Sequence, residues 1–256
     1  RKTNLDIHSC CAHNTLIMNN STIDRPRTNP IVDRYVTSDA PLLALLHAAP
    51  QPAPPLVRAL LLTQECLQGR RLARDAIGAA REVPVSGSDP ELLVMLFSAW
   101  AEISCRIGRP SEAEALLHQA RSLLSDSIHP EVRACCILAE SVVADATGNK
   151  ARCEELLRQV LTLLPAHSPR RKFYLWELLL FLAQQGRAAE MSAELRELTW
   201  QCNERFTMVR LQMIRFVDAV ETGRVKEASG LLPELSAGRH IVRDLTRIPY
   251  RGYQAL

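Results

Sequence analysis

Apolar and polar positions along the chain follow a helical period with regular interruptions. From Leu56 onward, apolar residues recur at three- and four-residue spacing in stretches of about 12 to 16 residues. Five of these stretches end at a glycine, and a second apolar-periodic stretch follows each glycine. The intervals between successive glycines are 39, 40, 38 and 37 residues, for Gly69, Gly108, Gly148, Gly186 and Gly223. The pattern predicts five helix pairs, each joined by a tight turn with glycine in the left-handed conformation.

Helix-breaking segments separate the predicted pairs. They read VPVSGSDP at 83–90, SDSIHP at 125–130 and LPAHSP at 164–169. In the first two, proline is followed by an acid, as expected where a helix begins. Repeats of this length suit a solenoid, because one helix pair cannot bury its apolar face alone and stacked pairs can. We therefore expect an all-α fold, a right-handed α–α superhelix of about five helix pairs.

The ends of the chain differ from this repeat. Residues 1–37 show no period and are expected to form a disordered N-terminal arm. Residues 38–55 are expected to hold a short helix, 40–49, and a proline-rich linker. The repeat domain is then predicted for 56–238, with a C-terminal helix and tail at 239–256.

Composition favours helix and gives little sign of nucleic-acid binding. Leu and Ala dominate an apolar fraction of 47%, whereas aromatic residues make up 5%. A net charge of +3 is too small for a nucleic-acid footprint. Two basic groups can either contact an acidic partner or a phosphate backbone, or form solvated faces and ends; the first lies at 170–172 and the second within 239–251.

The eight cysteines show no spacing typical of a disulfide framework, so a reducing cytoplasm is the expected location. No apolar run reaches the roughly 20 residues that a membrane span needs. The cluster HSCCAH at 8–13 resembles a metal site, but adjacent cysteines rarely bind one tetrahedral ion together. We predict no metal and no cofactor.

The helix pairs resemble the tetratricopeptide (TPR) repeat family in divergent form. In that family a glycine closes the first helix, and a small, a bulky and a small residue follow five, nine and twelve positions later. The second unit matches with Gly108, Ala113, Leu117 and Ala120, and the resemblance covers about residues 56 to 236.

The resemblance implies that the first helix of each pair contributes an inner face that binds partner peptides. Cys135 and Asp145 fall at such positions, but most matching residues are apolar. The candidate partner-binding residues are Met95, Leu138, Val142, Phe173, Trp176, Leu180, Met213 and Val217. Either these residues line a groove for an amphipathic helix, or they are core residues of the solenoid itself. A third alternative is that the 40–49 helix fills the groove as an internal plug.

Catalytic signatures such as GxGxxG, GxxxxGK[ST], HExxH and GxSxG are missing from the sequence, and we predict no enzyme. The expected function is protein–protein interaction, as an adaptor, scaffold or chaperone-like module that binds a peptide or amphipathic helix of another protein. The alternative is the ligand-sensing helical-repeat part of a bacterial transcriptional regulator. Homodimerisation stays open, while a membrane span and nucleic-acid binding are not expected.

Overall fold

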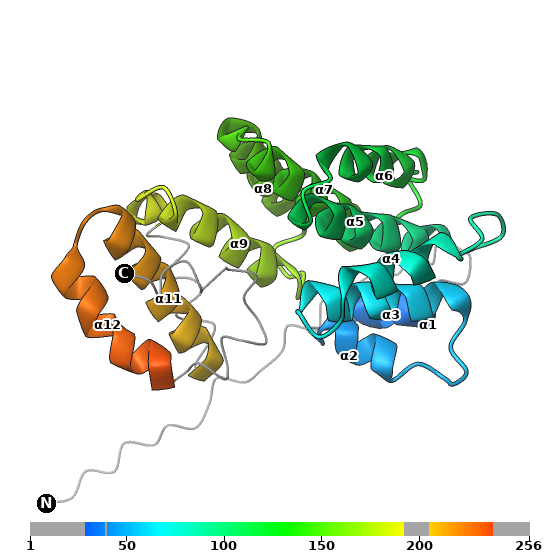
Figure 1. The fold of residues 1–256 in the computed structure, drawn as a ribbon, viewed down its shortest axis with the longest axis horizontal. Coiled ribbons are helices and arrows are strands. Elements are labelled where there is room, and N and C mark those ends of the chain that lie inside the picture. Colours follow the sequence, from blue (N-terminus) through cyan, green and yellow to red (C-terminus); the bar gives the residue numbers. More distant parts are fainter. Residues whose placement is uncertain (1–28, 39, 192–204, 238–256) are drawn as a thin grey trace, which may run out of the picture.

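The chain folds entirely into helices over the part that the structure describes. This computed structural model describes residues 29–38, 40–191 and 205–237, in which eleven α-helices and one short 3-10 helix, but no strand, are found (Figure 1). The all-α fold class is confirmed. The helices are α1 (Pro30–Thr37), α2 (Leu42–His47), α3 (Pro55–Leu67), α4 (Ala73–Arg81), α5 (Pro90–Arg106), α6 (Pro110–Ser122), α7 (Pro130–Ala146), α8 (Lys150–Leu163), α9 (Arg171–Ala183), η1 (Ala188–Met191), α11 (Arg205–Glu221) and α12 (Val225–Ala237).

The five predicted glycine turns are present. Each of these glycines has φ between 67° and 80°, the left-handed region that closes a helix. At Gly108 the backbone N–H donates to the Cys105 carbonyl (3.1 Å), and the next N–H, of Arg109, donates to Ser104 (2.8 Å). This pair of bonds is the Schellman motif. Both bonds recur at the other four glycines, so the repeat in sequence is a repeat of one backbone turn.

The helix pairs follow one another along the molecule. The two helices of a pair pack together, and α3, α5 and α7 pack side by side in chain order. Helix α9 packs against α8, η1 and α11. Figure 1 shows α1–α4 at one end of the long axis and α11 and α12 at the other.

Helices α5 and α7 form the centre of the core. Every residue of α5 from Glu91 to Cys105 is buried. Helix α7 carries two apolar stripes and so divides the interior into two cores. The first core, shared with α1–α6, contains Val132, Cys136, Ala139 and Val143 of α7. The second core, shared with α8, α9, α11 and α12, contains Ala134, Leu138 and Ala144 of α7.

The N-terminal arm departs from the prediction, because residues 30–37 form helix α1. The Asn29 side chain accepts a hydrogen bond from the Ile31 N–H (3.0 Å), and Pro30 occupies the first turn. Val32 and Tyr35 are buried on one side of this helix. The expectation of disorder up to residue 37 is therefore wrong for this segment, which gains its order from capping and burial.

The short helix expected at 40–49 is present as α2, and the linker expected at 51–55 ends where α3 begins at Pro55. Three other expectations lie outside the described residues. They are the HSCCAH cluster at 8–13, the C-terminal helix and tail at 239–256 with its basic group, and the part of the fourth unit at 192–204.

Candidate functional site

The predicted inner-face residues lie mostly inside the two cores. Five are buried, namely Met95, Leu138, Trp176, Met213 and Val217. Three are half-buried, namely Val142, Phe173 and Leu180. Met95 belongs to the first core and Leu138 and Trp176 to the second, so the structure does not gather the eight into one surface. Their role in binding stays a prediction, and the half-buried residues are the accessible ones.

Helix α1 covers part of the predicted inner face. The Tyr35 hydroxyl of α1 is hydrogen-bonded to the Cys135 thiol of α7 (3.3 Å), at a predicted inner-face position. The same thiol is 3.7 Å from the hydroxyl of Tyr174 on α9. Phe173, next in the chain, packs edge-on against the Tyr174 ring with centroids 5.3 Å apart. Helices α1, α7 and α9, which are distant in sequence, therefore meet around the Cys135 thiol, and the segment that covers this position is α1 rather than the 40–49 helix.

Arg170, at the start of α9, fixes the end of α1. Its guanidinium donates to the carbonyls of Tyr35 (2.8 Å) and Ala40 (2.6 Å). The guanidinium carbon also lies 4.0 Å from the centroid of the Tyr35 ring, which adds a cation–π contact. Arg170 is only 8% exposed. We call Tyr35, Cys135, Arg170 and Tyr174 the Tyr35 cluster.

The neighbourhood of the cluster is polar and hydrogen-bonded. The Ser168 hydroxyl donates to the buried carboxylate of Glu131 (3.1 Å) and accepts from the backbone N–H of Arg170 (3.3 Å).

Burial raises the pKa of the Cys135 thiol and of the Tyr35 and Tyr174 phenols. These groups stay protonated near neutral pH, so they act as hydrogen-bonding groups and not as nucleophiles.

The basic group at 170–172 does not form one surface. Arg170 is buried in the Tyr35 cluster, and Arg171 donates to the carbonyls of Leu161 and Leu164 at the end of α8. The alternatives from the sequence, a solvated end and a contact for an acidic partner or phosphate backbone, all fail for Arg170. Its guanidinium is occupied by backbone carbonyls of the same chain.

Sequence reasoning missed Tyr35 and Tyr174, and it placed Arg170 in a basic group without its buried role. One signal could have found α1: Asn29-Pro30 is a helix-start pair, and apolar residues follow at 31, 32, 35 and 36. No local signal marks Arg170, because its partner Tyr35 lies 135 residues away.

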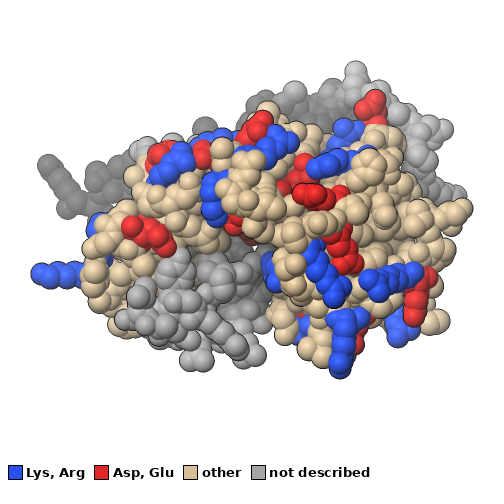
Figure 2. Space-filling model, turned by 45° about the horizontal axis from the view of Figure 1, so that its top comes forward, with Lys and Arg blue, Asp and Glu red and all other residues tan. Residues whose placement is uncertain are grey.

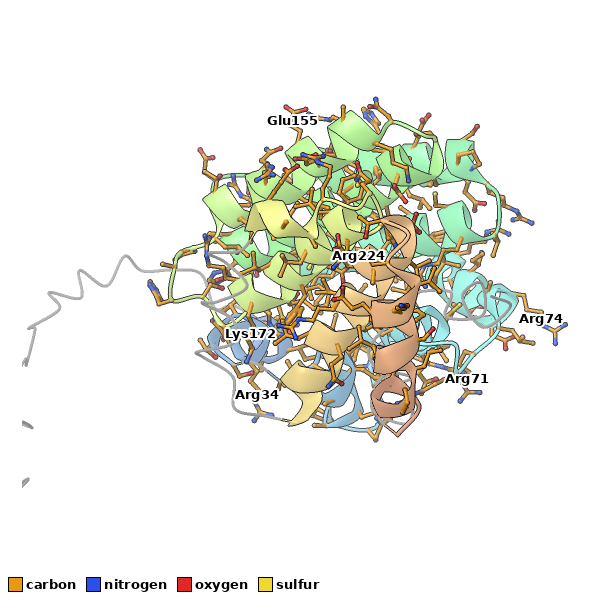
Figure 3. The ribbon with its side chains drawn as sticks, turned by 90° about the vertical axis from the view of Figure 1, so that its left-hand side faces the viewer. Arg34, Arg71, Arg74, Glu155, Lys172 and Arg224 are labelled. Carbon is orange, nitrogen blue, oxygen red and sulfur yellow. The ribbon has the colours of Figure 1, made fainter. Side chains whose placement is uncertain are left out.

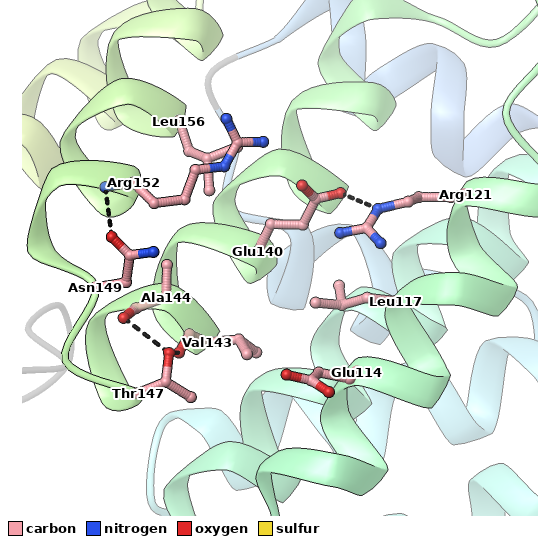
Figure 4. Close-up of a pocket in the computed structure, with 10 residues that line it drawn as sticks. All are labelled: Glu114, Leu117, Arg121, Glu140, Val143, Ala144, Thr147, Asn149, Arg152 and Leu156. Atoms are coloured by element: carbon pink, nitrogen blue, oxygen red, sulfur yellow. Dashed lines mark hydrogen bonds and ion pairs between the residues drawn. The ribbon is translucent and has the colours of Figure 1, made fainter.

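A second feature is a groove of about 360 Å³ between α6, α7 and α8 (Figure 4). Its charged side chains are partly paired: Arg121 of α6 bridges to Glu140 of α7 with an N–O distance of 2.6 Å. Asn149 accepts from the backbone N–H of Arg152 (3.1 Å) and so caps α8 at the edge of the groove. The groove can hold a small polar molecule.

Surface charges are mixed in sign. Figure 2 shows basic and acidic side chains interspersed over the face in view. Basic residues that follow the glycine turns lie beside acids and form ion pairs with them. These residues are Arg109, Lys150, Arg187 and Arg224. These side chains do not make an anion-binding patch.

Comparison with protein-family models, curated proteins and solved structures gives no match for this chain. Across the described ranges, no three side chains among His, Cys, Asp and Glu are placed to share a metal ion. None of the helices in those ranges combines the length and apolar character required to cross a bilayer.

Proposed function

We propose that this chain is a protein-interaction module, a divergent TPR-like array whose inner face binds an amphipathic helix of another protein. The observation that carries the proposal is the placement of α1. A short helix with one apolar side lies at the predicted inner-face position Cys135 and is held by Cys135 of α7 and by Arg170 at the start of α9. The face is therefore chemically suited to a helix.

The chemistry of the face fits such a ligand. Phe173, Val142 and Leu180 are apolar and half-buried, so they can supply apolar contact to a ligand. Arg170 supplies donors for the carbonyl groups that are left unpaired at the end of a helix. The combination is typical of helix-in-groove recognition, in which a few anchors dominate the binding energy.

A display selection tests this function. Helical peptides selected for binding to the full chain should lose affinity when Phe173→Glu places a charge at the half-buried anchor. The matched control is Gln119→Glu on the exposed side of α6. Trp176 is a poor probe because it is buried, and its replacement would test folding. If Phe173→Glu is destabilised in a melting experiment, Val142→Gln replaces it; selected peptides that bind all variants equally would contradict the proposal.

A second candidate function is sensing of a small ligand, as in the repeat part of a transcriptional regulator. The groove between α6, α7 and α8 favours it, because about 360 Å³ lies within the roughly 300 to 1,000 Å³ of ordinary ligand sites. A ligand of this groove should raise the melting temperature of the wild-type chain and not of Arg152→Ala. Gln159→Ala, exposed on the same helix, is the control. A metabolite panel without such a shift would argue against sensing.

A further inference from the structure

Helix α1 has the features of a ligand that can leave. It has eight residues, fewer than the roughly 12 to 15 that an isolated helix needs for even marginal stability in water. Its order therefore depends on the surface beneath it. Val32 is fully buried and Tyr35 is 7% exposed, whereas Arg34 and Thr37 are exposed on the outer side. Figure 3 shows Arg34 pointing away from the helices.

The contacts of α1 specify a simple recognition rule. One aliphatic residue and one tyrosine, three positions apart, supply the buried side chains. The tyrosine hydroxyl meets the Cys135 thiol, and its ring lies beside the Arg170 guanidinium. Phenylalanine at this position would keep the ring contact and lose the hydroxyl contact.

Arg170 adds recognition of the helix end. The two carbonyls that it binds, of Tyr35 and Ala40, belong to the last turn of α1 and the residues just after it. Carbonyls at a helix C-terminus lack partners within the helix whatever the sequence. Arg170 can therefore receive the end of any helix that places its tyrosine in the same position.

We propose that α1 is an internal ligand of the inner face, and that the partner is an amphipathic helix of the same kind which displaces it. This inference rests on the proposed function and specifies it. The partner carries an aliphatic residue and a tyrosine three positions apart and ends within about one turn of the tyrosine. Because α1 competes for the face, the apparent affinity for the partner equals the intrinsic affinity multiplied by the fraction of molecules in which the face is free.

The experiment uses the full chain and a labelled synthetic peptide of residues 29–41, NPIVDRYVTSDAP, as the probe. Val32→Asp in the chain places a charge at a fully buried position of α1 and should release the helix. Fluorescence anisotropy should then show peptide binding at least about tenfold tighter to this variant than to wild type. Arg34→Ala, at an exposed position on the same helix, should bind the peptide as wild type does.

The peptide carries its own controls. Replacing its tyrosine by alanine should abolish binding to the released chain, and replacing it by phenylalanine should weaken binding. If Val32→Asp lowers the melting temperature of the repeat helices, Tyr35→Ala in the chain serves as the release variant. Loss of both the ring and the hydroxyl then opens the face without a buried charge.

The outcomes separate this inference from the function on which it rests. Equal binding of the peptide to wild type and release variant overturns the role of α1 and leaves the proposed function intact. If the peptide binds neither wild type nor the release variant, while display-selected helices remain sensitive to Phe173→Glu, the role of α1 is likewise overturned and the proposed function stands. Failure of both experiments removes the function as well. A wild-type dimer that is lost in Val32→Asp would make a second copy of this chain the occupant and overturn the partner assignment.

Discussion

The carboxylate of Glu91, in the first turn of α5, accepts a hydrogen bond from the backbone N–H of His129 (2.8 Å), 38 residues later. The next unit repeats the arrangement, since Glu131 in the first turn of α7 accepts from the Ser168 hydroxyl (3.1 Å), 37 residues later. Both acids are buried. The sequence assigns these acids to helix starts, and in the structure they also tie each unit to the connector before the following helix.

The hydrogen bond between Glu91 and His129 predicts that replacing Glu91 destabilises the fold, although the sequence alone assigns this acid only a favourable interaction with the helix dipole. Glu91→Ala leaves the half-buried His129 N–H without its partner and should lower the free energy of unfolding by about 1–3 kcal/mol. Glu114→Ala, exposed on α6, should change it by less than about 0.5 kcal/mol. Urea denaturation followed by circular dichroism measures both. Similar values for the two variants would mean that the bond contributes nothing.

Three glycines offer a graded test of the turns. Gly108 has φ 78° and open space around an added Cβ, so Gly108→Ala should cost about 1–2 kcal/mol from backbone strain alone. Gly186 has φ 67°, and a Cβ there would lie 2.9 Å from Cγ2 of Thr222, so Gly186→Ala should cost more. Gly78 lies within α4 without a positive φ, and Gly78→Ala should stabilise by up to about 1 kcal/mol.

Urea denaturation of these three variants should therefore give the order Gly78→Ala, wild type, Gly108→Ala, Gly186→Ala, from most to least stable. Equal effects at Gly108 and Gly186 would show that the turn at Gly186 relaxes away from Thr222. A loss of stability in Gly78→Ala would contradict the helical backbone at that position.

The parts of the fold predicted from sequence are those that depend on local patterns. Helix pairs around Gly108 and Gly148 follow from apolar spacing and from the left-handed conformation that glycine adopts at a helix end. Whether Trp176 is buried or exposed could not be predicted. The apolar side of the first helix in each pair can line either a groove or a core, and the curvature of the array decides which. The Tyr35 cluster could not be predicted either, since a buried arginine in Arg170-Arg171-Lys172 looks like a surface charge until its distant partners are known.

The ion pair between Glu154 of α8 and Arg187, just after the Gly186 turn, predicts a pH dependence. The Arg187 guanidinium donates to Glu154 (2.7 Å), and this bond holds the pKa of the carboxyl below its usual value of 4.5. Because the folded-state pKa is lowered, the pair contributes stability above about pH 4.5, and the contribution is lost as pH falls through the folded-state value. Glu154→Gln should therefore be less stable than wild type at pH 7, and the two should converge in acid.

Urea titrations at pH 7, 5 and 3 measure the difference between the two proteins. The effect should be modest, because water screens a pair this exposed. Glu155→Gln, at the next position, removes an exposed pair with Arg152 inside the same helix and is the matched control (Figure 3). A difference between wild type and Glu154→Gln that stays constant with pH would rule out the ionised pair as its source.

Neighbouring arginines at the start of α9 should have separable effects. Arg170→Met removes both bonds to the end of α1 and the contact with the Tyr35 ring, while a side chain of similar length stays in place. Bonds to a buried charged donor contribute about 1.5–3 kcal/mol each, so α1 should open far more often. Hydrogen exchange at the amides of residues 31–37 should accelerate at least about tenfold, since each 1.4 kcal/mol is a factor of ten in the opening equilibrium.

Arg171→Met is the matched control, because Arg171 binds the carbonyls of Leu161 and Leu164 and has no such bond to α1. It should accelerate exchange at the end of α8 and leave the amides of residues 31–37 protected. The two variants should thus produce opposite patterns from adjacent positions of one helix start. Faster exchange in α1 for both variants, or for neither, would show that Arg170 does not hold α1 through its end, because only a direct bond to the Tyr35 and Ala40 carbonyls predicts this division.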